Sequence, residues 1–182
     1  MSGFTVDQVS ISSRHAPPFE VTNRLVLSVA VPMTLAYLTT PLLGIVDTAV
    51  VGQLGDPVLL GGLAAGAIVF DVVFNTFNGL RSSTTGLVAQ ALGRHDTVEE
   101  QAIFLRSLAL SISAGLVLIL LAPIVIAFGV WFISPDEPVA DAMALYIGIR
   151  ILAAPLTLTN FSILGYVLGR GEGGLGLLLQ LV

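Results

Sequence analysis

The chain contains no cysteine and no lysine, and charged residues of any kind are scarce. Its 182 residues include seven arginines, twelve acidic residues and two histidines, and 10% of its side chains are charged. Without cysteine, the sequence excludes a disulfide framework, a thiolate metal site and a thiol nucleophile. The net charge of −5 provides no basic field for nucleic acid. Two isolated histidines, His15 and His95, do not predict a metal site.

Apolar residues dominate instead. They make up 55% of the chain, and the mean hydropathy is +0.95, whereas an ordinary soluble domain carries about 25% charged residues. Four apolar stretches, at residues 25–54, 57–80, 103–133 and 139–169, each exceed the ~20 residues needed to cross a bilayer. An apolar run from about residue 175 predicts the start of a fifth helix. The predicted fold is an all-α, polytopic transmembrane bundle over residues 24–182, with four complete helices, solvated by membrane lipid.

The arginines predict the orientation of this bundle. Apart from Arg150, they lie before the first stretch, around the connection between the second and third, and after the fourth, whereas the connections at 53–59 and 134–141 contain none. By the positive-inside rule, residues 1–23 form a cytoplasmic segment of a multi-pass protein of the inner (plasma) membrane. In the inner connection, Thr97 and Glu100 match a T-x-x-E capping box that would open the third membrane helix.

Small residues recur at four-residue spacing in three of the predicted helices. Such faces allow helix backbones to approach closely, which predicts one compact bundle. The alternative is that glycine and alanine are simply common in membrane helices. The positions are Gly62 and Gly66, then Ser107, Ser111 and Gly115, and finally Gly165 and Gly169.

The first predicted helix contains two prolines and an acid. Pro32 and Pro41 each remove a backbone hydrogen bond, and nine residues of separation put them on opposite faces, so the helix either bends in two directions or carries static kinks. Asp47 must face water or a partner, or else become neutral, because an ionised carboxylate in lipid is costly. It is therefore a candidate proton or cation site, and a paired structural acid is the alternative. Thr40 and Gly44 lie below it on the same face.

Polar residues also occur within the second and fourth predicted helices. Asp71, Asn75 and Asn78 have i, i+4 and i+7 spacing and share one helix face, which predicts either a cavity lining or a hydrogen-bonded seam. Arg150 lies at nearly the depth of Asp71, and the sequence predicts an intramembrane ion pair with Asp71 or Asp47. A structural role is the favoured interpretation for this arginine.

The sequence shows no enzyme signature. It has no G-x-S-x-G elbow, no H-E-x-x-H motif and no P-loop, and neither histidine lies inside a predicted span. No organic or metal cofactor is predicted.

Four sequence segments resemble one family of membrane proteins. They are residues 41–55 (PLLGIVDTAVVGQLG), residues 80–93 (LRSSTTGLVAQALG), residues 146–150 (YIGIR) with Pro155, and residues 165–169 (GYVLG). Together they resemble the MATE (multidrug and toxic compound extrusion) family, and most of all its DinF-like branch. Family members have two six-helix lobes, so this chain resembles part of an N-terminal lobe, and the fifth helix breaks off where the sequence ends.

The resemblance implies a transporter rather than an enzyme. It implies an antiporter that exports amphipathic, often cationic small molecules by alternating access, driven by H⁺ or Na⁺. Asp47 falls on the family's first-helix acid, implicated in cation coupling, and Pro32 on the proline associated with bending. Asp71 departs from the pattern expected of the branch. The fragment alone should be inactive, because alternating access requires the missing C-terminal lobe as a partner. The alternatives are a flippase of lipid-linked precursors in the same superfamily and a non-transporting membrane scaffold subunit.

Overall fold

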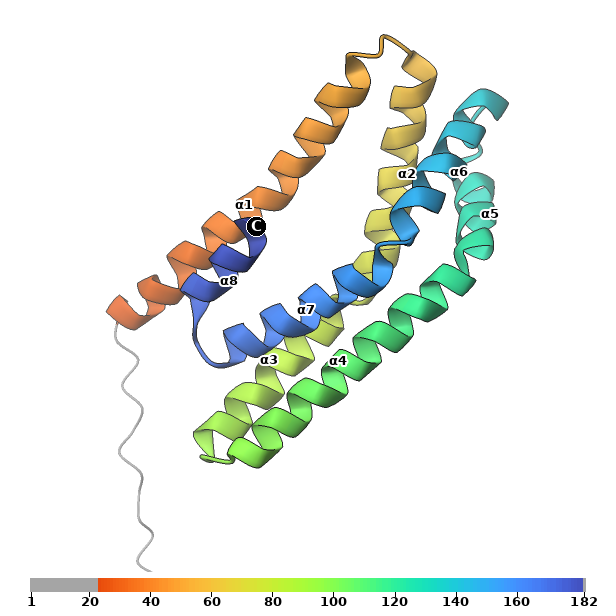
Figure 1. Ribbon diagram of the computed structural model, residues 1–182. Helices are drawn as coiled ribbons and strands as arrows, with labels where there is room; N and C mark the ends of the chain where they lie inside the picture. The colour runs from red at the N-terminus through yellow and green to blue at the C-terminus, as the bar shows by residue number, and fades with distance from the viewer. Residues whose placement is uncertain (1–22, 182) are drawn as a thin grey trace, which may run out of the picture.

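A computed structural model describes residues 23–181, so the predicted cytoplasmic segment lies almost entirely outside the described residues. The described part of the chain is all-helical (Figure 1). The elements are α1 (Asn23–Gly52), α2 (Pro57–Thr76), α3 (Asn78–Gly93), α4 (Thr97–Leu120), α5 (Ala122–Ile133), α6 (Glu137–Ile151), α7 (Ala154–Gly169) and α8 (Gly173–Leu181). The predicted all-α class is thus confirmed.

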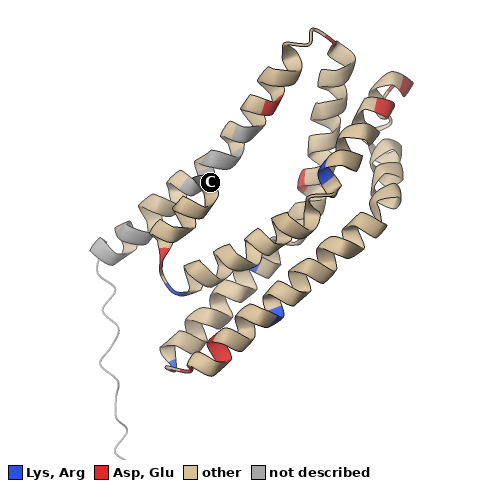
Figure 2. Cartoon of the chain, viewed as in Figure 1, with Lys and Arg blue, Asp and Glu red and all other residues tan. Residues whose placement is uncertain are grey.

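Several helices have the length and composition of membrane spans. Together α2 and α3 form one candidate span of 37 residues, α4 covers 24, and α6 with α7 forms a third span if the 53° bend between them is counted within it. With 30 residues, α1 also exceeds the ~20 residues that a span requires. Figure 2 shows charged residues mainly near helix ends, with long uncharged stretches between them. These features agree with a multi-pass membrane protein. That the chain crosses the membrane four times stays a prediction.

Three of the predicted membrane helices are broken in the structure. The second continues beyond residue 80 to Gly93, with a break at Phe77. The third begins at Thr97, ahead of the apolar stretch at residues 103–133, and breaks at Leu121; the fourth breaks at residues 152–153. Prolines follow two of the breaks, Pro123 in the first turn of α5 and Pro155 in the first turn of α7. A proline is tolerated in a first turn and disrupts a helix interior, which explains both positions.

The three breaks surround one apolar cluster. Its buried members come from α2, α4, α6 and α7, and side chains next to each break pack against them. The bends of three spans are therefore stabilised by a shared core. The buried members are Phe70, Phe74, Leu118, Ile151, Ala154 and Leu158.

Glycines occupy the points where these helices cross, as the spacing of small residues predicted. A Cβ atom on Gly115 of α4 would lie 2.3 Å from Cα of Pro155 in α7, and one on Gly62 of α2 would lie 2.5 Å from Cβ of Ala142 in α6. A Cβ on Gly165 of α7 would approach the backbone oxygen of Arg81 in α3 to 2.8 Å. Only glycine permits these approaches.

The start of α4 differs from the predicted capping box. Asp96 is the N-cap, and its side chain accepts a hydrogen bond from the backbone N–H of Glu99 at 3.0 Å. Thr97 is already inside the helix, and Glu100 is buried in the bundle. The capping box prediction is wrong because aspartate is a stronger N-cap than threonine and stands one residue earlier.

The helices form two groups (Figure 1). Helices α2 to α7 pack through the pairs α2 with α6, α4 with α7, and α3 with α7, whereas α1 packs mainly along α8. Many large apolar side chains on the outside are exposed, including Trp131, Leu120 and Leu156. This surface fits a chain surrounded by lipid and further protein rather than water.

Candidate functional site

Asp47 lies near the end of α1 and faces α6. Its carboxylate oxygen Oδ2 is 3.8 Å from a guanidinium nitrogen of Arg150. The two side chains are 39% and 37% exposed. Of the two partners predicted for Arg150, the structure brings Asp47 within ion-pair distance. This pair joins the α1 and α8 group to the α2 to α7 group.

Aromatic rings surround the guanidinium of Arg150. Its central carbon lies 4.8 Å from the ring centroid of Phe70 and 5.4 Å from that of Tyr146. A guanidinium nitrogen also donates a hydrogen bond to the Tyr146 hydroxyl, one helical turn earlier in α6. Cation–π contacts of this kind stabilise an arginine that is partly removed from water. Arg150 therefore has favourable contacts that do not depend on Asp47.

Glycine in α2 determines where the Tyr146 ring lies. A Cβ atom on Gly66 would be 2.5 Å from the ring carbon Cδ1 of Tyr146, so the ring packs directly on the α2 backbone. Phe70, one turn further along α2, stacks on Phe74 with 4.2 Å between ring centroids. The wall behind Arg150 is consequently well packed.

The remaining residues predicted for the site are distributed along α1, α2 and α3. Asp71 and Asn75 are exposed on α2, whereas Asn78 begins α3 beyond the break at Phe77, so the three do not share one uninterrupted helix face. Gly44 and Pro41 contribute to a shallow depression of about 450 Å³ on α1. The side chain of Thr40 lies outside the described part of the structure.

The two prolines of the first helix do not interrupt it. Pro32 and Pro41 both lie inside α1, which is continuous from Asn23 to Gly52. Next to Asp47, the Thr48 hydroxyl donates to the carbonyl oxygen of Gly44 at 2.8 Å, within the same helix. Bending at the prolines stays a prediction. Within residues 23–181, no cluster of three or more His, Asp or Glu side chains could hold a metal ion.

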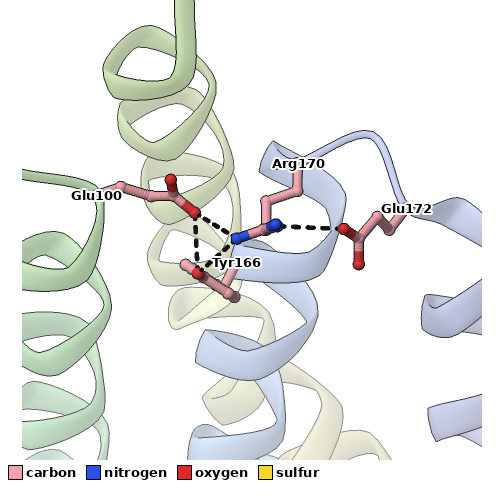
Figure 3. A network of polar contacts seen from close by, with 4 residues as sticks. All are labelled: Glu100, Tyr166, Arg170 and Glu172. Carbon is pink, nitrogen blue, oxygen red and sulfur yellow. Dashed lines mark hydrogen bonds and ion pairs between the residues drawn. The ribbon is translucent and has the colours of Figure 1, made fainter. Parts of the chain in front are cut away.

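A second polar site was not predicted from the sequence (Figure 3). Glu100 of α4 is only 4% exposed, and one of its carboxylate oxygens accepts hydrogen bonds from the Tyr166 hydroxyl and from Arg170, each at 2.8 Å. Arg170 also donates to Tyr166 at 3.0 Å and to Glu172 at 3.1 Å. Hydrogen bonds to Tyr166 and Glu172 raise the pKa of Arg170 above its usual value. The guanidinium therefore stays charged at every physiological pH.

This network ties three elements together. Glu100 lies in the first turn of α4, Tyr166 in α7, and Arg170 and Glu172 in the turn between α7 and α8. The sequence contained one usable signal, because Glu100 follows the same spacing as the buried positions of α4, including Ile103, Ser107 and Ser111. That spacing places Glu100 on the packed face of the helix.

Comparisons with known proteins agree on one family. The MatE family profile matches residues 32–182, which include both polar sites. The chain is 39% identical over 140 residues to DNA damage-inducible protein F of Escherichia coli K12, an alignment covering 77% of this chain and 30% of that protein. It is 30% identical over 129 residues to Protein DETOXIFICATION 47, chloroplastic, of Arabidopsis thaliana, covering 68% of this chain and 23% of that protein. A probable multidrug resistance protein NorM of Halalkalibacterium halodurans is 28% identical over 123 residues, which are 68% of this chain and 24% of that protein. No solved structure gives a significant match.

Proposed function

Because the chain belongs to the MATE family, as its motifs indicated, we propose that the protein works as a secondary active exporter of amphipathic, cationic small molecules. MATE proteins are membrane transporters rather than enzymes. The chain spans about a quarter of the length of these curated relatives, so the activity is proposed for the longer protein that such a chain would form part of. An inward gradient of H⁺, or of Na⁺, would drive export by alternating access.

The observation that carries this proposal is the position of Asp47. The carboxylate lies between α1 and the α2 to α7 group, and it is partly exposed, so a cation can reach it. Binding of H⁺ or Na⁺ at Asp47 would change the charge at the contact between the two groups of helices. If the two conformations bind the cation at Asp47 with different affinities, a cation gradient can shift their populations.

The other predicted residues have supporting roles in this proposal. Pro32 and Pro41 would allow α1 to bend when Asp47 changes its charge. Asp71, Asn75 and Asn78, with Thr40 and Gly44 on α1, would line the cavity of the lobe. The N-terminal segment would lie in the cytoplasm and the protein in the plasma membrane, with lipid around it and the C-terminal lobe completing the substrate pathway.

Export assays on Asp47→Asn in the full-length protein test the proposal. Asparagine has nearly the same volume as aspartate and can still form hydrogen bonds, yet it cannot bind and release a proton. The variant should insert normally and fail to export a fluorescent cationic dye from proteoliposomes against a gradient. Asp136→Asn is the matched control, because Asp136 is an exposed acid at the start of α6 and its side chain makes no capping hydrogen bond.

Three results would contradict the proposal. Gradient-driven export by Asp47→Asn at the rate of the wild type would exclude Asp47 from coupling. Absence of dye export by the wild-type protein, combined with movement of lipid-linked precursors, would favour the flippase. Absence of any transport would favour the scaffold subunit.

A further inference from the structure

The pair formed by Asp47 and Arg150 occupies a distinctive position among the ion pairs of the described residues. The other pairs lie within α4 or in the network around Glu100, and this one joins α1 to α6. Since α1 packs mainly along α8, an attraction between α1 and α6 contributes directly to holding the two groups of helices together.

We propose that Arg150 is a positioning residue that holds the ionised carboxylate of Asp47 against α6 and competes with the coupling cation for it. This inference rests on the proposed function. When H⁺ binds, the carboxylate becomes a neutral carboxyl group, and the attraction to the guanidinium is lost. With that attraction lost, α1 is released from α6.

The contacts of Arg150 explain why the pair can open. After Asp47 is neutralised, the guanidinium keeps its hydrogen bond to the Tyr146 hydroxyl and its position over the rings of Phe70 and Tyr146. Opening of the ion pair therefore does not leave a buried cation without a partner, which would be costly. The pair is also weak, because its atoms are 3.8 Å apart and both side chains are more than one third exposed. The carboxylate of Asp47 can therefore exchange Arg150 for the coupling cation.

Other charged groups near this region do not replace Arg150. On α2, Asp71 is exposed and Asp56 accepts a hydrogen bond from the backbone N–H of Val58. On α6, Glu137 and Asp141 lie in the first turns, and Tyr146 contacts Arg150 itself. Described residues of α8 include no titratable side chain. Arg150 is therefore the cation within ion-pair distance of Asp47 among the described residues.

Transport measurements can distinguish a positioning role of Arg150 from a purely structural one. The quantity to measure is the concentration of the coupling cation at which export is half-saturated. Arg150→Met in the full-length protein removes the competing charge and keeps the length of the side chain. We expect half-saturation at about a two- to fivefold lower concentration of H⁺ in sodium-free proteoliposomes, because an exposed ion pair of this kind is weak and its removal leaves H⁺ without a competitor for the carboxylate. If Na⁺ drives export, the same change is expected in its half-saturating concentration. Arg150→Lys should restore the wild-type value, and Arg106→Met, which breaks an exposed pair within α4, should leave it unchanged.

The failure of this inference differs from the failure of the proposed function. An unchanged half-saturating concentration in Arg150→Met, with Asp47→Asn still inactive, would refute positioning by Arg150 and leave the coupling role of Asp47 intact. Normal export by Asp47→Asn would refute both.

A distance measurement provides the test if Arg150→Met does not fold. Spin labels at Val50→Cys and Leu145→Cys, both exposed, report the separation of α1 and α6. In the wild type, the distance should be longer at low pH, where Asp47 is protonated, than at high pH. Asp47→Asn should show that longer distance at every pH. A distance in Asp47→Asn equal to that of the wild type at high pH would refute the inference.

Discussion

Replacing Gly115 by alanine tests whether the crossing of α4 and α7 is as close as the structure places it. The new Cβ atom would lie 2.3 Å from Cα and 2.6 Å from the backbone nitrogen of Pro155. Backbone atoms cannot rotate away, so α4 and α7 would have to separate by more than about 1 Å to reach ordinary van der Waals contact near ~3.5 Å. Overpacking of this kind costs about 1 to 3 kcal/mol, and contact with two backbone atoms favours the upper end.

The intrinsic preference of alanine for helices offsets part of that cost. Alanine is favoured over glycine inside a helix by about 1 kcal/mol, which leaves a net destabilisation of about 2 kcal/mol for Gly115→Ala. Gly86→Ala in α3 is the matched control, because a Cβ atom there would meet no neighbouring helix or side chain within 4 Å. The control should be neutral or slightly stabilising, so the two variants should differ by about 2 to 3 kcal/mol.

Thermal unfolding of the detergent-purified, full-length protein measures this difference. Gly115→Ala should unfold several degrees below the wild type, whereas Gly86→Ala should unfold at or slightly above it. Gly66→Ala should fall between them, because its Cβ would meet the ring of Tyr146, a side chain that can move. Equal melting temperatures for Gly115→Ala and Gly86→Ala would refute the close crossing.

Three other predictions concern buried polar contacts and topology. Ser162→Ala should destabilise the protein by about 1 to 2 kcal/mol in thermal unfolding, more than Ser111→Ala, because the Ser162 hydroxyl bonds both Ser111 and a backbone carbonyl of α4. Glu100→Leu should lower the melting temperature more than Glu100→Gln, because an amide oxygen can still accept from the tyrosine and arginine of its network. In a cysteine-free background, an impermeant thiol reagent on intact cells should label Asp136→Cys and not Ser2→Cys.

Each of these predictions has a contrary result. A larger loss in Ser111→Ala than in Ser162→Ala would contradict the order of the hydroxyl contacts. Equal melting temperatures for the two Glu100 variants would mean that the network adds nothing to stability. Labelling of Ser2→Cys from outside the cell would reverse the proposed orientation.

Helix content could be predicted from the sequence with little difficulty, because long apolar stretches in a nearly charge-free chain leave few alternatives. The breaks were harder to predict. Pro123 and Pro155 carried a usable signal, since each stands shortly after a break, yet Pro32 and Pro41 lie inside an unbroken helix. A proline alone does not decide between a break and a continuous helix, because the packing around it determines which one is stable.

Polar contacts between distant residues were predicted only in part. The sequence left two possible partners for Arg150, Asp47 and Asp71. The choice between them depends on how α1 lies against α6, and the spacing of residues within one helix gives no information about that. The contact between Glu100 and Arg170 joins residues seventy positions apart. Local signals assigned Glu100 to a helix cap, and tertiary packing placed it in the interior instead.

The shared apolar cluster at the three helix breaks has a consequence for hydrogen exchange. The amides of Phe77, Leu121 and Ala153 lie at the breaks and donate to carbonyl oxygens within their own bends at 3.0, 2.9 and 3.1 Å. Because the same cluster stabilises all three bends, none of them can open far without exposing the side chains that support the others. We therefore expect these amides to form one cooperative unit that exchanges slowly and with a common free energy of opening, and the amides of α1 and α8 to exchange in a separate and earlier event.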